Sequence, residues 1–574
     1  MKKFYHFRDY QRAKLESHAF YKLIDSDIIP LKNKLMFAPV MAHFVMNFRD
    51  MNKWVIRFAT TDSKFKSVIN AGTTEDETHS RLFLEDWRKL YLDDKLNWKA
   101  SDIIYWLFIS PEMECFRKYG VEFMRLCVDD NNDPILRYSH SESGETCGNV
   151  FFSKISPIAD EVAHELGVQL RYFGSFHLGL ENGHVWKSEG VFENEVLLPE
   201  YYDKVRNLSQ RMFDIFTGIH DAFYHYTLKY IVKHEVHNFS NPVKTEGKIL
   251  TTPSEINITQ TQKNNEEIIH YVDSYLREID EHPFFDWVKS STINAELKIK
   301  CFIPLWIVDI MMYRDINNYI FTYMCPGSMG ELLINDYARH LACHSALFYN
   351  DWKALKLDDM LRWSASDTLE FIFLNTDMDS HRKNLVNFSL HGMKNKDPLI
   401  RFWFMMILEL SGKSFFSVIG QVAMQAESEC NISLPYLTGK HSSAEEQKSY
   451  CALYEYFINQ DISKEQVKTI KYLSDIVMRS LLENLDISYK YALNNIFCGA
   501  LITNTTLIMV SLPGGQCFSA SGAKPTSGTT FAATNAAVAI SRPAAVVSGV
   551  GVPVSAGLSR TDRILGQGQA HQNQ

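Results

Sequence analysis

The sequence predicts an all-α protein made of two related helical bundles in tandem, followed by a flexible C-terminal tail. Three observations support this prediction. Apolar residues recur at spacings of three and four along most of the chain, whereas the alternation that marks β-strands is scarce. Segments of the first half return about 264 positions later in the same order. The composition changes abruptly near residue 513.

The internal repeat extends through most of the first 500 residues. The segment HSRLFLEDWRKLYLDDKLNWKASD at 79–102 returns as HSALFYNDWKALKLDDMLRWSASD at 344–367. Likewise, DPILRY at 133–138 returns as DPLIRF at 397–402. A register that is kept over about 200 positions indicates duplication rather than chance. We therefore expect two related domains that pack together as an intramolecular pseudo-dimer.

Composition sets the expected domain boundaries. We expect the first bundle over residues 1–235 and the second over 265–512. The stretch 236–264 is polar, contains two prolines and lacks periodicity, which predicts a linker. Residues 513–574 are rich in Gly, Ala, Ser and Thr and have almost no aromatic side chains. Such a segment buries too little apolar surface to order itself, so we expect a flexible tail.

Two segments illustrate why helices are expected. Leu82, Phe83, Trp87 and Leu90 fall on one face of a helix at spacings of three and four. The long amphipathic segment that begins at Leu198 has a proline near its start, where helix N-termini favour this residue. From such segments we expect six to eight helices in each bundle.

Charge and composition argue against several classes of partner. The net charge of −9 is spread along the chain, so we expect neither nucleic acid nor an anionic membrane surface as partner. The N-terminus is charged and lacks the apolar core of a Sec-type signal, and no apolar run reaches membrane-spanning length. The ten cysteines are scattered without a CxxC pair, which predicts buried thiols in a reducing compartment. We expect a cytoplasmic protein, with secretion by a signal-independent route left open.

The strongest chemical signal lies in YFGSFHLGLENGHVW at 172–186. His177, Glu181 and His184 stand at i, i+4 and i+7, so on a helix they lie within about 60° of one another. Their apolar neighbours predict that this stripe faces the core, where ionisable groups without partners would cost several kcal/mol. A metal ion removes that cost, and imidazole with carboxylate suits iron, manganese or zinc.

Further ligands are expected on two other segments. Asp76 and His79 are an i, i+3 pair and Glu75 and His79 an i, i+4 pair, so either carboxylate can share a face with the imidazole. Glu145 stands between a polar and an apolar stretch. A carboxylate–His pair, a single Glu and a His-x3-Glu-x2-His helix together match the ligand set of dinuclear carboxylate proteins, in which facing helices supply the ligands.

This pattern resembles the heme-oxygenase-like diiron oxidases and oxygenases. The resemblance covers both copies and rests on the family's carboxylate–His pair, its middle-helix Glu and its His-x3-Asp/Glu-x2-His motif. The matching residues, in that order, are Asp76 and His79, then Glu145, then His177, Glu181 and His184. The carboxylate of the first pair stays ambiguous among Glu75, Asp76 and Glu77.

The resemblance implies a fold, a cofactor and an activity. Each copy is expected to be a heme-oxygenase-like bundle, and the six matched residues of the first copy are expected to hold two iron ions. O2 is the implied co-substrate, and a small molecule is oxidised. Glu145 and Glu181 are the implied catalytic carboxylates, which change their mode of metal binding, while the histidines fix the metals. The substrate, the electron donor and the choice between iron and manganese are left open.

The second copy keeps only part of this ligand set. Four of the six ligands are kept: His79, Glu145, His177 and Glu181 align with His344, Glu409, His441 and Glu445. The other two are replaced, since Leu341 aligns with Asp76 and Lys448 with His184. A lysine ammonium opposes cation binding, so we expect a pseudo-domain in which Lys448 neutralises Glu409 and Glu445. His340 leaves a weaker alternative site in this copy.

Simpler explanations are expected for other conspicuous residues. His18 and His282 precede aromatic pairs and are expected to start helices or to pack, although a heme would need an axial histidine near them. Four other histidines are expected on the surface or in the core with their hydrogen bonds satisfied: His140, His164, His220 and His225. Trp87 and Trp106 are expected in the core.

Two other functions compete with the oxidase. The decayed second copy and the tail favour a non-catalytic interaction or effector scaffold built from the duplicated bundle. Cofactor-free chemistry of the thiaminase type is the other alternative, but it needs a nucleophilic cysteine, and no cysteine stands in an activating context. Analysis of bound metal distinguishes the oxidase from the scaffold.

Overall fold

The computed structural model describes residues 1–180, 191–240, 263–290, 293–440 and 444–503, all of which belong to one compact unit. Every regular element in these ranges is a helix. The described residues contain no strand, and the β-type pairing found among them is one isolated bridge between Lys99 and Ser364. The prediction of an all-α protein is confirmed.

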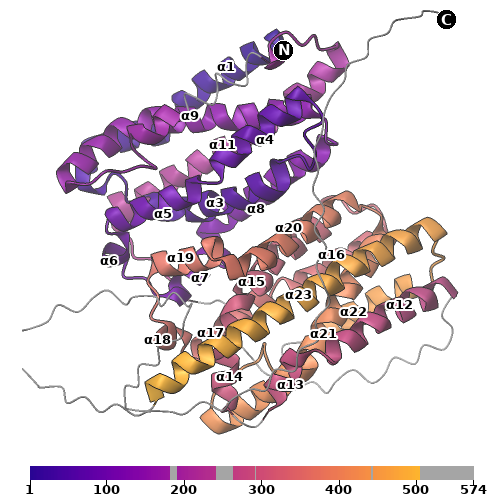
Figure 1. Cartoon of the computed structure of the whole chain (residues 1–574). Coiled ribbons are helices and arrows are strands. Elements are labelled where there is room, and N and C mark those ends of the chain that lie inside the picture. Colours follow the sequence, from indigo (N-terminus) through magenta and orange to yellow (C-terminus); the bar gives the residue numbers. More distant parts are fainter. Residues whose placement is uncertain (181–190, 241–262, 291–292, 441–443, 504–574) are drawn as a thin grey trace, which may run out of the picture. The chain divides into compact units, whose positions relative to one another are not determined.

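The first half is built from ten described α-helices with short 3-10 and π-helical turns between them (Figure 1). The α-helices are α1 (Lys2–Glu16), α2 (Ala19–Asp25), α3 (Ala38–Asp50), α4 (Lys64–Asp76), α5 (His79–Lys89), α6 (Leu92–Leu96), α7 (Ala100–Phe108), α8 (Glu114–Asp129), α9 (Pro134–Leu166) and α11 (Pro199–Tyr226). The expectation of six to eight helices is therefore too low for this half. Left-handed residues at Tyr91 and Asn97 break the periodic segment after α5 into separate short helices.

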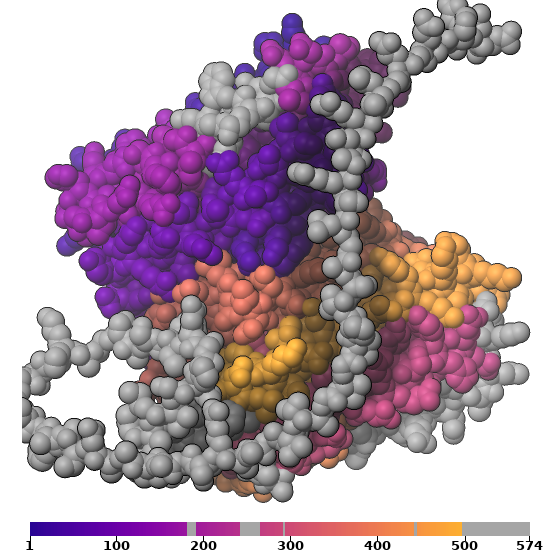
Figure 2. Space-filling view, in the orientation of Figure 1, coloured from indigo at the N-terminus to yellow at the C-terminus, as the bar shows by residue number. Residues whose placement is uncertain are grey.

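The described part of the second half begins with α12, and its elements follow in a similar order. They are α12 (Lys263–Asp280), α13 (Pro283–Lys289), α14 (Ala295–Phe302), α15 (Ile307–Asp315), α16 (Met329–Leu341), α17 (His344–Ala354), α18 (Leu357–Leu361), α19 (Ala365–Leu374), α20 (Asp379–Lys394), α21 (Pro398–Cys430), α22 (Ala444–Ile458) and α23 (Lys464–Thr503). Figure 2 shows α12 and α23 on the surface of this half, where the two helices pack together.

Helix starts follow from local sequence. Asp133 accepts hydrogen bonds from the first backbone N–H groups of α9, and Asp397 does the same for α21, with a proline next in the chain each time. The Nδ1 atoms of His18 and His282 accept from the backbone N–H two residues later. The expectation that these two histidines start helices is confirmed.

Large apolar side chains of both halves form one continuous core. Trp87 and Trp106 are buried, as expected, and the predicted apolar face of α5 is buried with them. The expectation that cysteines are buried holds for Cys127 but is wrong for Cys325 and Cys343, which are exposed. Both exposed cysteines lie outside the helices, Cys325 before α16 and Cys343 after it.

The two halves touch through contacts that occur twice with their roles exchanged. The backbone N–H and the hydroxyl of Ser101 both donate to Asp358, at 3.0 and 2.6 Å. In the same way Ser366 donates to Asp93, at 2.9 and 2.6 Å. Each serine lies in the first turn of its helix, so the partner carboxylate also lies at a favourable helix N-terminus.

Buried ion pairs form a second set of matched contacts between the halves. Arg382 Nε lies 2.8 Å from a carboxylate oxygen of Asp50, and Arg117 Nε lies 3.4 Å from one of Asp315. All four side chains are almost fully buried. Each arginine also donates to a backbone carbonyl of its own half, which fixes the guanidinium at the interface.

The start of the expected linker is packed against the first half. The His237 ring stacks on Tyr230 with centroids 3.8 Å apart, and the Tyr105 hydroxyl donates to the carbonyl of Ser240. Residues 241–262 and the expected tail at 513–574 lie outside the described residues.

One helix of the described chain is long and apolar enough to cross a membrane. It is α21, and 61% of its most apolar window is buried inside the protein. Buried core helices have the same length and composition, so the absence of a membrane span stays a prediction.

Candidate metal centre

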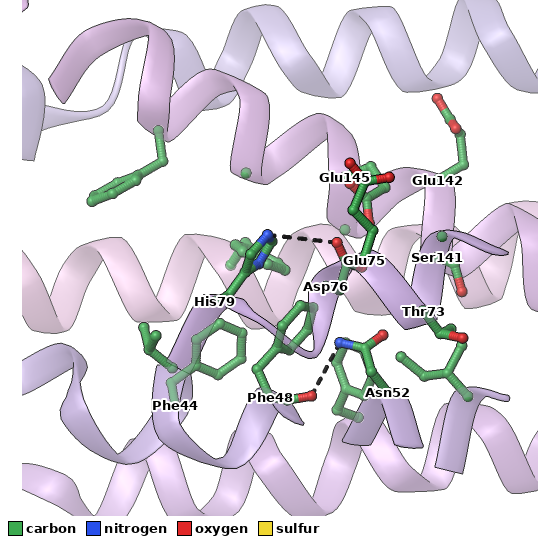
Figure 3. Close-up of a pocket in the computed structure, with 18 of the residues that line it drawn as sticks. Phe44, Phe48, Asn52, Thr73, Glu75, Asp76, His79, Ser141, Glu142 and Glu145 are labelled. Carbon is green, nitrogen blue, oxygen red and sulfur yellow. Dashed lines mark hydrogen bonds and ion pairs between the residues drawn. The ribbon is translucent and has the colours of Figure 1, made fainter. Parts of the chain in front are cut away.

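The end of α4 and the start of α5 place two predicted ligands together. Asp76 closes α4 and His79 opens α5, with a two-residue turn between them. Both side chains are buried, and an Asp76 carboxylate oxygen lies 3.7 Å from His79 Nε2 (Figure 3). The Phe48 ring lies parallel to the His79 imidazole, with centroids 6.1 Å apart, and helps to hold its orientation.

His177 brings a second imidazole to this point from a distant part of the chain. It is fully buried, and its Nε2 lies 3.0 Å from His79 Nε2. Its Nδ1 lies 2.9 Å from the Tyr172 carbonyl, which only accepts, so Nδ1 carries the hydrogen and Nε2 keeps its lone pair. Metal-binding histidines are commonly oriented by such a hydrogen bond.

The distance between the two imidazoles fits a shared metal ion. Two nitrogen ligands at about 2.1 Å from one ion and about 90° apart lie about 3.0 Å from each other. The Nε2 atoms of His79 and His177 lie at this separation. Asp76, which stands beside His79, adds the type of carboxylate that occurs with imidazole at iron sites. These three side chains offer nitrogen and oxygen donors of the types that iron binds, and the two imidazoles are also within hydrogen-bond distance of each other.

A buried carboxylate fixes the segment that carries His177. Asp86 on α5 accepts hydrogen bonds from the backbone N–H groups of Arg171, Tyr172 and Phe173, at 2.8–3.0 Å. Burial raises the pKa of Asp86, and these three hydrogen bonds oppose that rise. Because Asp86 and His79 share one helix, the same element orients both imidazoles.

The ambiguity among the three carboxylates of this turn is partly resolved. Glu77 pairs with Arg57, so its charge is already compensated. Glu75 and Asp76 both line the same cavity as His79 and Glu145, and Figure 3 shows their carboxylates close together in this view. Asp76 is the more deeply buried of the two.

α9 contributes Glu145 and a second acid that sequence reasoning missed. Glu142 lies one helical turn before Glu145 and lines the same cavity. It is buried, and Arg8 of α1 lies 2.6 Å from its carboxylate. The i, i+3 spacing to Glu145 is a signal that could have found it.

These side chains surround a cavity of about 270 Å³. Its walls are mostly apolar, and its described lining includes no lysine or arginine. This volume is just below the range of pockets that hold drug-sized ligands, so it suits a small molecule. Its apolar lining includes Met41, Phe44, Val45, Phe48, Ile69, Phe123, Phe151, Phe152, Phe216 and Phe223.

His220 also lines the cavity, but its hydrogen bonds are complete. The Tyr21 hydroxyl lies 2.6 Å from Nε2, and Nδ1 lies 2.7 Å from the Phe216 carbonyl. Burial lowers the pKa of His220 to about 4, so the ring is neutral near pH 7. The expectation of a satisfied core histidine is confirmed for His220.

We expect acidification to destabilise the fold through buried histidines. Burial lowers the pKa of His43 to about 3, whereas an unfolded histidine titrates near 6.5. Between these two pKa values only the unfolded chain binds the proton. The free energy of unfolding therefore decreases as the pH is lowered, by about 2 kcal/mol from pH 7 to pH 5 for this residue. Urea unfolding at both pH values measures the loss. The variant His43→Phe should lose about 2 kcal/mol less than the wild type, and equal losses would contradict this prediction.

The predicted ligands Glu181 and His184 lie outside the described residues. Residues 175–180 are helical, so His177 lies near the start of a helix, as its motif requires.

The second half has a different arrangement from the one expected. Glu445 and Lys448 are exposed, so the expectation that Lys448 neutralises Glu409 is wrong. The acid that faces His344 is Glu446, whose carboxylate lies 3.3 Å from His344 Nε2. A change of one residue rotates a side chain by about 100° around a helix, which explains the difference. His441 lies outside the described residues.

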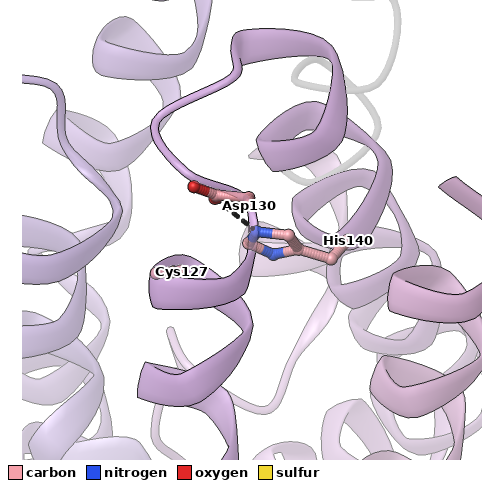
Figure 4. A group of neighbouring side chains, drawn as sticks. All are labelled: Cys127, Asp130 and His140. Atoms are coloured by element: carbon pink, nitrogen blue, oxygen red, sulfur yellow. Dashed lines mark hydrogen bonds and ion pairs between the residues drawn. The ribbon is translucent and has the colours of Figure 1, made fainter. Parts of the chain in front are cut away.

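A separate group in the first half has the composition of a metal site but is better explained as a buried ion pair. Potential ligand atoms of Cys127, Asp130 and His140 all lie within 4.8 Å of one another (Figure 4). However, Arg137 binds both carboxylate oxygens of Asp130, at 2.7 and 2.8 Å. Burial also raises the pKa of Cys127 to about 12, so its sulfur stays protonated. The guanidinium already supplies the positive charge that a metal would bring.

No family model matches this chain, and no curated protein matches it.

Proposed function

We propose that this chain is a nonheme diiron protein that uses O2 to oxidise a small molecule bound in the first-half cavity. In this proposal the chain is a tandem of two heme-oxygenase-like bundles, and the second is a pseudo-domain. The observation that carries the proposal is the pair of imidazole Nε2 atoms 3.0 Å apart, beside Asp76, at the wall of an apolar cavity.

The proposed roles follow from position. His79 and His177 hold the metals with Asp76 and Glu145, and the predicted ligands outside the described residues complete the set. When bound, the two iron ions supply the reduction of O2. The chain orients the imidazoles through the Tyr172 carbonyl and the Phe48 ring, and its apolar walls exclude water from the cavity.

The cavity also favours one class of substrate. Its described lining has no cationic side chain to bind an anionic group, and Glu142 is neutralised by Arg8. Aromatic and aliphatic side chains cover most of the surface. We therefore propose a largely apolar substrate, with the bond that reacts held near His79 and Glu145.

Iron binding tests this proposal directly. Titration of the metal-free full chain with ferrous iron under anaerobic conditions should give two ions per chain. His177→Ala or Glu181→Ala should remove most of this iron while the circular dichroism of the helices is unchanged. Lys448→Ala is the matched control, because its exposed side chain has no role in the site, and it should bind iron like the wild type. Iron binding by His177→Ala at the wild-type level would refute the assignment.

The scaffold is the second candidate, and the matched buried contacts between the halves favour it. It needs no metal. A wild-type chain that binds neither iron nor manganese, with or without air, would reject the oxidase and leave the scaffold. Consumption of O2 faster than by ferrous iron alone, and lost in His177→Ala, would reject a purely structural role.

A further inference from the structure

α4 and α16 can be compared position by position, because the same contact anchors each of them. Asn70 of α4 binds both the N–H and the C=O of Phe58, at 2.8 Å each. Asn335 of α16 binds the same two groups of Tyr323, at 2.6 and 2.8 Å. Both helices have 13 residues and start after a serine cap. The residues that follow each asparagine therefore occupy equivalent positions.

Two residues after this asparagine, α4 has Gly72. Glycine destabilises the interior of a helix relative to alanine, so its presence there needs a reason. Gly72 lines the cavity, and a Cβ atom added to it would meet no other atom within 4 Å. The bare backbone of α4 is thus part of the cavity wall, and the space in front of it is open.

At the equivalent position, α16 has Tyr337. Its side chain is 2% exposed, so the ring lies inside the second half. Burial raises the pKa of Glu409 and the Tyr337 hydroxyl opposes that rise, so the tyrosine lies close to this acid. Glu409 lies eleven residues after the first residue of α21, and Glu145 lies eleven residues after the first residue of α9. The tyrosine ring therefore reaches the acid that corresponds to the cavity acid of the first half.

We propose that Gly72 determines whether this cavity takes a ligand: an apolar group of the ligand packs against α4 at Gly72, in the space that the Tyr337 side chain fills in the second half. The identification of this ligand as a substrate rests on the proposed oxidase function. The binding of an apolar molecule at Gly72 does not.

Binding of a neutral apolar fluorophore, N-phenyl-1-naphthylamine, to the full metal-free chain tests the proposal. Gly72→Tyr should weaken binding about tenfold or more, because the ring occupies the volume that the probe needs. Gly72→Ala adds one methyl group to open space and should stay within about twofold of the wild type. The circular dichroism of the helices is measured on the same samples and should be unchanged in both variants, so that a loss of probe binding cannot come from unfolding.

The reverse substitution gives an independent test. Tyr337→Gly should open a cavity in the second half and raise the number of bound probe molecules per chain. Tyr337→Phe keeps the ring and should leave that number unchanged. Probe binding by Gly72→Tyr at the wild-type level, or no probe binding by the wild type, would overturn the proposal. If the probe behaves as expected and the wild type binds no iron, the role of Gly72 stands and only the oxidase function fails.

Discussion

Replacing Arg137 with alanine is expected to lower the free energy of unfolding by about 3–5 kcal/mol, because it leaves a buried carboxylate without its cation. Asp130 is fully buried and receives two hydrogen bonds from this guanidinium. Burial by itself raises the pKa of Asp130, but hydrogen bonds from His140 and Arg137 lower it overall. The loss is measured by urea unfolding at pH 7.

Arg171→Ala provides the control for this prediction. Its side chain is 39% exposed and pairs with Glu85 at 3.4 Å, so its removal should cost less than about 1 kcal/mol. Metal chelators should not change the stability of the wild type or of Arg171→Ala, since Arg137 rather than a metal supplies the positive charge beside Asp130. A loss below 1 kcal/mol in Arg137→Ala, or strong stabilisation by an added metal, would show that the ion-pair interpretation is wrong.

Arg382→Ala is expected to have an effect of similar size, about 3–5 kcal/mol, at the contact between the halves. This arginine is 2% exposed and pairs with Asp50, which is equally enclosed. Burial raises the pKa of Asp50 to about 6 even though Arg382 opposes the rise. Without Arg382, Asp50 keeps only the longer contact with Arg49, at 3.9 Å, so the fold must either hold a poorly compensated charge or bind a proton. Arg117→Ala is the matched change, at the equivalent contact with Asp315.

A double variant separates the ion pair from packing. Arg382→Met with Asp50→Asn removes both charges and should recover most of the loss, because the cost comes from the poorly compensated buried carboxylate. Arg88 pairs with Glu370 at another contact between the halves, and its side chain is 43% exposed. Arg88→Ala should therefore lower the free energy of unfolding by less than about 1 kcal/mol. If the double variant is as unstable as Arg382→Ala, packing of the long side chain is the source of the effect.

Local sequence predicted the parts of the site that depend on few residues. Asp76 and His79 are three positions apart across a short turn, so their proximity follows from the chain itself. The helix-start roles of His18 and His282 are equally local, because the ring reaches a backbone N–H only two residues away. In each case the contact needs no information about distant elements.

Other features depend on how helices rotate against one another. Glu445 and Glu446 are adjacent acids, and sequence alignment selected the one that packing leaves exposed. Glu77 and Asp76 are also neighbours, but Arg57 from another element pairs with Glu77. From the sequence alone, either acid of each pair is an equally good candidate for the residue that faces the site. Packing distinguishes them, because adjacent residues on a helix differ by about 100° in direction.

By itself, the amino-acid sequence determined the helical class, the starts of the helices and the carboxylate–imidazole pair of the first half, because periodicity and short-range hydrogen bonds act within a few residues. The tertiary structure alone decided that His177 lies 3.0 Å from His79, that Arg8 compensates Glu142, and that a cavity lies in front of Gly72. These contacts join residues up to 134 positions apart, and only the packing of several helices around one space fixes their distances.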